Sequence, residues 1–237
     1  MLTLENVHAA YGHSKALHGV NLRIDEGEAV CLVGRNGAGK TSTMRAIVQD
    51  LIRVIEGSVQ FMGTELAGLS PHQVVQRGVG YVPEDRRVFP NLTVAENLIV
   101  PRSYGKQSQA ARPWTVERVY TLFPPLREFR TRLAGNLSGG QQQMLSIGRS
   151  LLTNPSLLLL DEPHEGLAPL VAQQVVEAVN ELKAAGVSML ISEQHLHLVH
   201  ETADRIYVID RGVTVFEGTL AAFEGSPEIA EKYLMVM

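Results

Sequence analysis

The chain has 237 residues, 45% of them hydrophobic and 19% charged, and its 21 basic and 25 acidic side chains leave a formal net charge of −4 at pH 7. This is ordinary globular composition, so the chain can bury a core and wholesale disorder is not expected. A broad nucleic-acid-binding face usually needs an excess of basic residues, and the mildly acidic balance argues against that class of protein.

The sequence also bears on the compartment in which the chain works. Cys31 is the only cysteine, so no intrachain disulfide can form, which fits a reducing compartment. The N-terminus lacks the cationic start and apolar stretch of a signal peptide, and no apolar run approaches the ~18 residues that span a bilayer. We therefore expect a cytoplasmic chain that depends on other subunits for any membrane-spanning part.

Short apolar runs alternate with helical patterns along the chain. Strands are expected at Leu2–Val7, Leu17–Ile24, Glu28–Val33, Val79–Val82, Ser156–Leu160 and Val187–Ile191, with a hairpin formed by Ile206–Ile209 and Thr214–Glu217. Helices are expected at Lys40 to about Val48, Val94–Val100, Thr115–Phe123 and Gly140–Leu152. This order predicts a parallel sheet buried on both faces, a mostly helical insertion between Leu92 and Leu152, and a surface loop at Pro101–Pro113.

A glycine-rich segment follows the strand expected at Glu28–Val33. Residues 34–41 read GRNGAGKT and match G-x-x-x-x-G-K-[ST] between a strand and a helix. The glycines let backbone N–H groups turn inward around phosphates, and the helix N-terminus adds partial positive charge. Lys40 is expected to reach the β- and γ-phosphates, and the Thr41 hydroxyl to bind Mg²⁺. The predicted phosphate-binding residues are Gly34, Arg35, Asn36, Gly37, Ala38, Gly39, Lys40, Thr41 and Ser42.

Two carboxylates stand where a run of four leucines ends, at Asp161 and Glu162. A buried strand delivers its last residues to the sheet edge at which open α/β proteins bind ligands. Asp161 is therefore expected to bind Mg²⁺ through water, and Glu162 to polarise an attacking water as a general base. Taken alone, the same pair could simply cap a helix that follows a core strand.

Residues 137–143 read LSGGQQQ, and with the two motifs above they give the whole chain a resemblance to the ATP-binding subunits of ABC transporters. The resemblance implies ATP and Mg²⁺, and a signature that contacts the γ-phosphate held by the opposite subunit through Ser138, Gly139, Gly140 and Gln141. It also implies an α/β fold with a P-loop NTPase core of ABC ATPase type and an N-terminal antiparallel β region. Residues 1–237 would form one domain, with a helical subdomain near residues 92–152.

A closer resemblance is to importers of branched-chain amino acids, specifically to the shorter of their two ATP-binding subunits. It is carried by YVPEDRRVFP at 81–90, DEPHEGLAP at 161–169 and SEQH at 192–195. It implies a heterodimer of two ATPases under two membrane-spanning permeases, served by a periplasmic binding protein and with no nucleic-acid partner. The implied location is the cytoplasmic face of the inner membrane, and the implied function is ATP-driven uptake of branched-chain amino acids or a related small polar solute.

The resemblance gives roles to two further residues. Tyr11 matches the aromatic residue that stacks on adenine in the family, although a tyrosine beside Gly12 can also pack in a turn. Glu84 stands where most members carry a glutamine that senses the nucleotide and touches the permease. A carboxylate there can still bind Mg²⁺ or orient water; the alternative is a solvated surface side chain.

The chain departs from the family pattern at three positions. Ala168 replaces an aspartate that usually makes contact across the dimer, and His164 replaces Ser or Thr, which we interpret as tolerated variation. Gln194 occupies the place of the switch histidine, although a one-residue slip would give that place to His195. We favour Gln194, because Glu193-Gln194 matches the importer subgroup, and count it as catalytic with Lys40 and Glu162. A glutamine can donate a hydrogen bond to phosphate, but at neutral pH it cannot take up a proton or carry a positive charge.

Two other functions stay open on the sequence alone. ABC-type ATPases that act on nucleic acid or the ribosome usually carry two fused ATP-binding units or long coiled-coil insertions, and this chain has neither. A nucleotide-gated regulatory subunit would bind ATP with little turnover; Glu162 argues against it and Gln194 for it. The sequence does not specify the transported solute, so urea, short amides and aromatic acids stand beside branched-chain amino acids.

Overall fold

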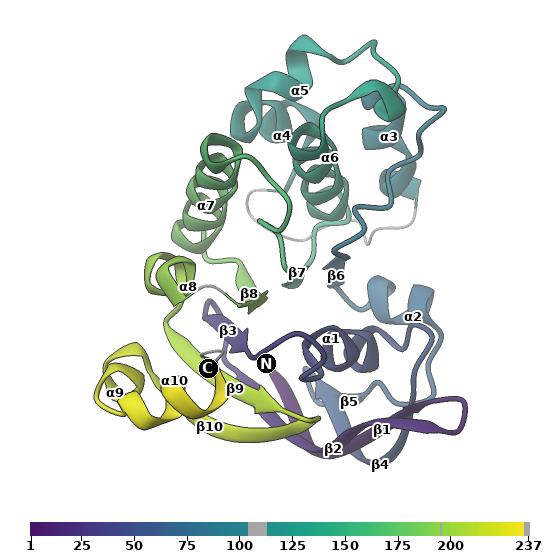
Figure 1. The fold of residues 1–237 in the computed structure, drawn as a ribbon. Coiled ribbons are helices and arrows are strands. Elements are labelled where there is room, and N and C mark those ends of the chain that lie inside the picture. Colours follow the sequence, from purple (N-terminus) through teal and green to yellow (C-terminus); the bar gives the residue numbers. More distant parts are fainter. Residues whose placement is uncertain (104–112, 195, 235–237) are drawn as a thin grey trace.

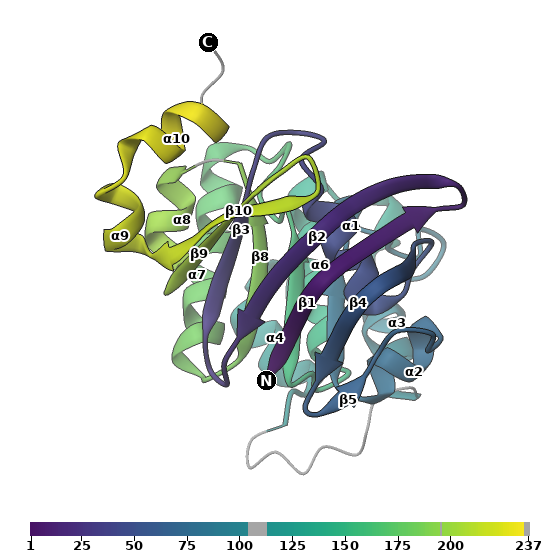
Figure 2. The same ribbon diagram turned by 90° about the horizontal axis from the view of Figure 1, so that it is seen from below.

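The structure is a computed structural model that describes residues 1–103, 113–194 and 196–234. Four strands near the N-terminus form an antiparallel sheet in the order β2-β1-β4-β5. They are β1 (Leu2–Tyr11), β2 (Ser14–Ile24), β4 (Arg53–Phe61) and β5 (Thr64–Glu65). Seen from below, β1, β2 and β4 lie in front of the strands of a second sheet (Figure 2).

The second sheet has six strands in the order β10-β9-β3-β8-β7-β6. They are β3 (Ala29–Val33), β6 (Val79–Val82), β7 (Leu157–Asp161), β8 (Ser188–Glu193), β9 (Arg205–Asp210) and β10 (Val213–Thr219). All neighbours pair in parallel except β9 and β10, which form the expected hairpin. Every residue of β3 and β7 is buried, as predicted for a parallel sheet covered on both faces.

The helices lie around this sheet (Figure 1). They are α1 (Lys40–Val48), α2 (Pro71–Gln76), α3 (Val94–Ile99), α4 (Val116–Leu122), α5 (Pro124–Glu128), α6 (Gly139–Leu151), α7 (Pro169–Ala184), α8 (Leu196–Thr202), α9 (Leu220–Glu224) and α10 (Pro227–Tyr233), with short 3₁₀ turns at Val100–Ser103 and Ala134–Asn136. Helices α3 to α6, which come between β6 and β7, lie together at the end of the molecule opposite the antiparallel sheet.

Alternate residues of the central strands pack into two separate cores. Leu158 and Leu160 of β7 face a core shared with α6 and α7, whereas Leu157 and Leu159 face a core shared with α1 and the antiparallel sheet. This follows from the two-residue period of a strand. Full burial of each leucine contributes roughly 1.5–3 kcal/mol. Because β7 is packed between two cores, the position of its C-terminal end is fixed, and so are the positions of Asp161 and Glu162.

The expected elements are observed, but several others are not predicted individually: strands β4 and β5 and helices α2, α5, α7, α8, α9 and α10. The strand β4 was not expected, because only Val59 and Phe61 near its end are buried and Gly57 interrupts its pattern. Most of the loop expected at Pro101–Pro113 lies outside the described residues. In the described part of the chain, none of the helices has both the length and the apolar character that a bilayer crossing requires.

Candidate active site

The glycine-rich segment forms a loop between β3 and α1, as its sequence predicts. Gly37 and Gly39 have φ angles of 78° and 116°, a backbone region that favours glycine. The side chain of Lys40, at the start of α1, folds back into this loop. Its Nζ donates to the carbonyl oxygens of Gly34 at 2.7 Å and Arg35 at 3.2 Å. The loop is thereby wrapped around the end of a lysine side chain that is only 4% exposed.

Asp161 is the last residue of β7 and lies beside the start of α1. Its carboxylate accepts hydrogen bonds from Thr41 Oγ1 at 3.2 Å, Ser192 Oγ at 2.7 Å and Tyr81 Oη at 3.1 Å. Burial raises the pKa of Asp161 above its ordinary value, and these three hydrogen bonds oppose that rise. A carboxylate next to a hydroxyl is the hard oxygen pair that Mg²⁺ prefers, so Asp161 and Thr41 fit the ion.

Glu162 lies beside Asp161 and forms an ion pair with Lys40, whose Nζ is 3.0 Å from Glu162 Oε1. Gln194 Nε2 donates a hydrogen bond to the other carboxylate oxygen, Oε2. Burial alone would raise the pKa of Glu162, but a hydrogen bond with Glu165 and the charge of Lys40 lower it. Glu162 is therefore held ionised, as a general base must be.

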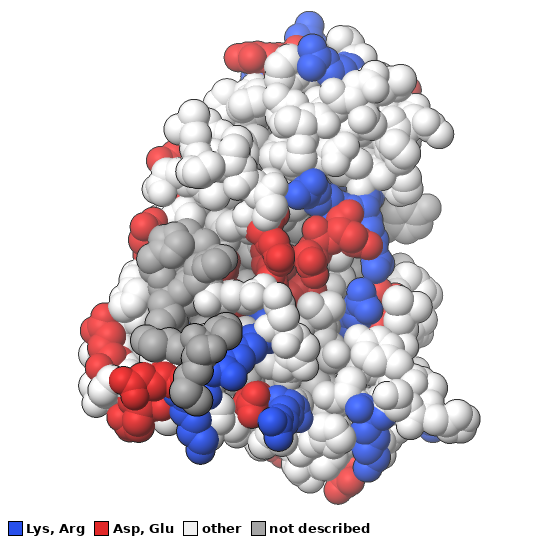
Figure 3. Space-filling view, in the orientation of Figure 1, with Lys and Arg blue, Asp and Glu red and all other residues white. Residues whose placement is uncertain are grey.

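Glu165 and Glu84 complete the acidic side of the site. The hydrogen bond with Glu162, followed by burial, raises the pKa of Glu165 to about 7. Burial and then the charges of Glu162 and Asp161 raise the pKa of Glu84. Acidic side chains are gathered in the hollow at the middle of this face of the molecule (Figure 3). A bound cation is favoured by so many carboxylates, and it would lower these pKa values again.

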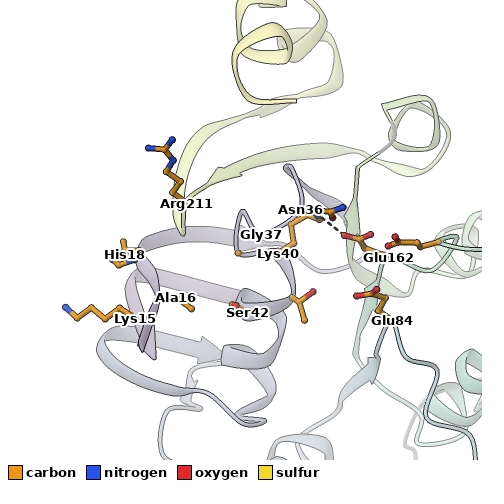
Figure 4. A pocket seen from close by; sticks show the side chains of 13 residues that line it. Lys15, Ala16, His18, Asn36, Gly37, Lys40, Ser42, Glu84, Glu162 and Arg211 are labelled. Atoms are coloured by element: carbon orange, nitrogen blue, oxygen red, sulfur yellow. Dashed lines mark ion pairs between the residues drawn. The ribbon is translucent and has the colours of Figure 1, made fainter. Parts of the chain in front are cut away.

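A cleft of about 560 Å³ is lined by residues that include Lys40, Thr41, Glu84, Glu162 and Glu165 (Figure 4). Lys40 and Glu162 point toward each other across it, and Glu84 lies beside Glu162. At the other end are basic side chains that the sequence analysis did not identify: Lys15 and His18 from β2 and Arg211 from the β9–β10 turn. That turn is held by two backbone hydrogen bonds, from Gly212 N–H to Ala38 O and from His18 N–H to Gly212 O, both 2.7 Å long.

The predicted adenine-stacking residue is near this cleft but does not line it. Tyr11 is half-buried against the core that includes α1, and its hydroxyl oxygen is 3.3 Å from Ser42 Oγ. This is the arrangement expected of a turn-packing tyrosine. Stacking on adenine stays a prediction, because it requires the ring to present a free face to the base.

The predicted signature lies apart from the cleft, since none of the described lining residues comes from 137–141. Ser138 caps α6: its hydroxyl accepts from Gln141 N–H at 3.3 Å, and its own N–H donates to Gln141 Oε1 at 3.0 Å. This capping box satisfies two N–H groups at the start of α6, where the remaining N–H groups and the helix dipole attract anions. The structure thus brings together Lys40, Thr41, Glu84, Asp161, Glu162 and Gln194 but not the signature, and His195 lies outside the described residues.

A family model for ABC transporters matches residues 17–165, which is more than half of the chain. The chain belongs to the ABC transporter family. This ABC ATPase is 40% identical over 234 residues to the high-affinity branched-chain amino acid transport ATP-binding protein BraG of Pseudomonas aeruginosa, and the alignment covers 99% of both chains. The comparison confirms the predicted resemblance to ATP-binding proteins of branched-chain amino acid transport.

Solved structures agree with this assignment. The ABC ATPase superposes with a TM-score of 0.82 on a nucleotide-free ATP-binding cassette, at 29% identity and over 98% of this chain and 97% of the other. A dimeric cassette bound to ADP and phosphate in a post-hydrolysis state gives a TM-score of 0.80 at 25% identity, over 93% and 99% of the two chains. The predicted fold class and the predicted ATP hydrolysis are thereby confirmed.

Proposed function

We propose that this ABC ATPase powers the uptake of branched-chain amino acids, or of a related small polar solute, at the cytoplasmic face of the plasma membrane. The 40% identity to BraG over almost the whole chain carries the proposal. The test is to reconstitute the chain with its permeases, its partner ATPase and the periplasmic binding protein in liposomes. ATP-dependent accumulation of radiolabelled leucine supports the proposal. Accumulation of urea, a short amide or an aromatic acid instead of leucine would identify the related solute, and ATP-dependent accumulation of none of them contradicts the proposal.

The cleft supports a direct assignment of roles in ATP hydrolysis. Glu162 accepts the proton of the water that attacks the γ-phosphorus, and Lys40 neutralises charge on the phosphates. Gln194, bonded to Glu162, is close enough to orient the same water or the γ-phosphate. Thr41, Asp161 and Glu84 supply oxygen ligands for Mg²⁺, which when bound neutralises phosphate charge and orients the nucleotide. Tyr11 remains the residue proposed to stack on adenine.

The separation of signature and cleft supports a dimer as the active species. Ser138–Gln141 carries a helix N-terminus suited to a phosphate but does not line the cleft of its own chain. A second ATPase subunit would supply that contact, as in a sandwich of two cassettes. Turnover should then rise more than linearly with protein concentration, or on addition of the partner ATPase. An isolated monomer that is as fast as the full complex would contradict the sandwich.

Gln194 supports a difference between the two sites of such a dimer. Loss of general acid–base work by a histidine costs roughly 10²–10⁴-fold in rate, and much less if the histidine only positions the phosphate. This chain's own cleft would be the slower site, while its intact signature completes the partner's site. Glu162→Gln should then cost less total turnover here than the matching change in the partner. If instead His195→Ala is as damaging as Glu162→Gln, His195 is the switch residue and the two sites need not differ.

A groove beside the loop Glu84–Phe89 supports a permease contact. It has a volume of about 350 Å³, and its lining includes Tyr81, Arg86, Arg87 and Arg149. Phe89 is 42% exposed, so it is not a core residue, and the Arg149 guanidinium lies over its ring at 4.4 Å from the centroid. An aromatic ring beside arginines has the composition of an interface hot spot, whose truncation costs about 2 kcal/mol or more.

Phe89→Ala should therefore uncouple transport from hydrolysis. Binding to the permease would weaken by roughly 30-fold for a loss of about 2 kcal/mol, while ATP turnover by the chain itself stays normal. Ile55→Ala is the matched control, because Ile55 is also exposed but lies on β4 in the other sheet. Normal transport by a folded Phe89→Ala variant would exclude this loop from the interface.

A further inference from the structure

The end of β8 contacts the loop after β7 at three successive residues, Ser192, Glu193 and Gln194. Ser192 Oγ accepts from the backbone N–H of Glu162 at 2.8 Å, and Gln194 Nε2 donates to the Glu162 carboxylate. Between these two contacts, the Glu193 carboxylate bonds to Nδ1 of His164. The outer contacts serve the proposed general base directly. The middle one joins two side chains that have no role in the chemistry described above.

His164 and Glu193 are both buried, with side-chain exposures of 5% and 4%. A buried carboxylate is strongly destabilising unless it is paired. Because a carboxylate can only accept, His164 Nδ1 donates to Glu193. The other ring nitrogen, Nε2, is buried without a hydrogen-bond partner among the residues that the structure describes. Among the described residues, Glu193 is therefore the hydrogen-bond partner of the buried His164 ring.

The loop that His164 anchors contains a strained residue. Glu162 has a φ of 45°, in the left-handed region that residues other than glycine rarely adopt. Such a backbone persists only where its surroundings fix it. Ser192 fixes the loop at the Glu162 N–H, and Glu193 fixes it again at His164. Ser192 and Glu193 both belong to β8, which pairs with β7 on one side and with β3 on the other. The strand that holds the Glu162 loop is therefore adjacent to β3, from which the phosphate-binding loop extends.

We infer that His164 is a positioning residue for ATP hydrolysis: its buried bond to Glu193 holds the loop so that the Glu162 carboxylate stays directed into the cleft, beside Lys40. The inference rests on the role proposed for Glu162, and it replaces our interpretation of His164 as tolerated variation. A shift of a reacting group by ~1 Å can cost on the order of 10²-fold in rate. His164 is not among the residues that line the cleft. Loss of the bond should lower kcat and leave ATP affinity unchanged.

The test compares kcat with the dissociation constant for ATP in the purified full-length chain. His164→Ala removes the bond, whereas His164→Asn keeps a short N–H donor. Leu66→Ala is a control for lost stability, because Leu66 is fully buried but does not line the cleft. We expect His164→Ala to lower kcat on the order of 10²-fold with ATP affinity within about twofold of wild type, and His164→Asn to recover most of kcat. A folded His164→Ala with normal kcat, or an Asn variant as slow as Ala, overturns the inference.

Two further variants test the inference if His164→Ala does not fold and separate the role of His164 from that of Glu162. If His164→Ala fails to fold, His164→Leu combined with Glu193→Met removes both partners and leaves no unpaired buried charge. This double variant should show the same kcat deficit, and a normal kcat overturns the inference. Glu162→Gln separates the two proposals: wild-type kcat there refutes the role of Glu162 itself. The expected defect in Glu162→Gln together with normal kcat in His164→Ala refutes only the role of His164.

Discussion

The ion pair between Lys40 and Glu162 leads to a prediction in which ATP affinity and turnover move in opposite directions. A phosphate must compete with Glu162 for the ammonium group, since Lys40 Nζ lies 3.0 Å from Glu162 Oε1 and both side chains are buried. The Coulomb attraction at that distance is about 5 kcal/mol for an effective dielectric constant near 20. Close charge pairs couple by ~1.5–7 kcal/mol, and we take the low end because Glu162 keeps Gln194 as a partner.

Glu162→Gln should therefore bind ATP roughly tenfold more tightly, since ~1.4 kcal/mol corresponds to a factor of ten. Its turnover should fall by roughly 10²–10⁴-fold, because a glutamine cannot accept the proton of water. The assays are equilibrium binding of a fluorescent ATP analogue and release of phosphate. Glu28→Gln is the control, because it breaks an ion pair of similar length, 2.9 Å to Arg205, outside the cleft. Weaker ATP binding by Glu162→Gln would refute this reasoning.

Three further predictions concern the same cleft and its signature. Lys40→Ala should weaken ATP binding by ~100-fold or more in the same binding assay, because the phosphates lose their counter-ion; unchanged affinity would contradict the assignment of Lys40. Ser138→Arg should depress phosphate release by the assembled complex while this chain's own ATP affinity stays normal, and equal loss of both would contradict a signature that acts on the partner's site. The pKa of Glu165 is raised to about 7, so folding favours its protonated form. Chemical denaturation should show the free energy of unfolding falling from about pH 4.5 to 7 relative to Glu165→Gln, and parallel pH curves would contradict this shift.

The groups that the sequence predicted are those whose positions follow from local chain geometry. The glycines around Lys40 specify a phosphate-binding loop on their own, and a buried strand necessarily delivers Asp161 and Glu162 to the edge of the sheet. Both arguments use neighbouring residues only. The same reasoning predicted a helix from Gly140, and the structure has α6 there.

The residues that the sequence missed depend on contacts between distant segments. Arg211 reaches the cleft because its turn bonds to β2 and to the phosphate-binding loop, more than 170 positions earlier in the chain. The role of His164 depends on a carboxylate 29 positions away. Nothing near position 164 indicates that a histidine in a loop will be buried. The positions of Arg211 and His164 depend on tertiary packing, which local sequence patterns do not predict.

The turn at Gly212 also holds the phosphate-binding loop in its folded conformation. Gly212 hydrogen-bonds to that loop and to β2. Its φ is 74°, and a Cβ at this position would lie only 2.4 Å from Ala16 O, so only glycine fits here. The loop cannot loosen without breaking bonds that involve both sheets. We therefore expect the loop to unfold cooperatively with the two sheets. The Gly212 amide should exchange its proton with solvent only on sub-global unfolding, and the nucleotide meets a loop whose shape is set before binding.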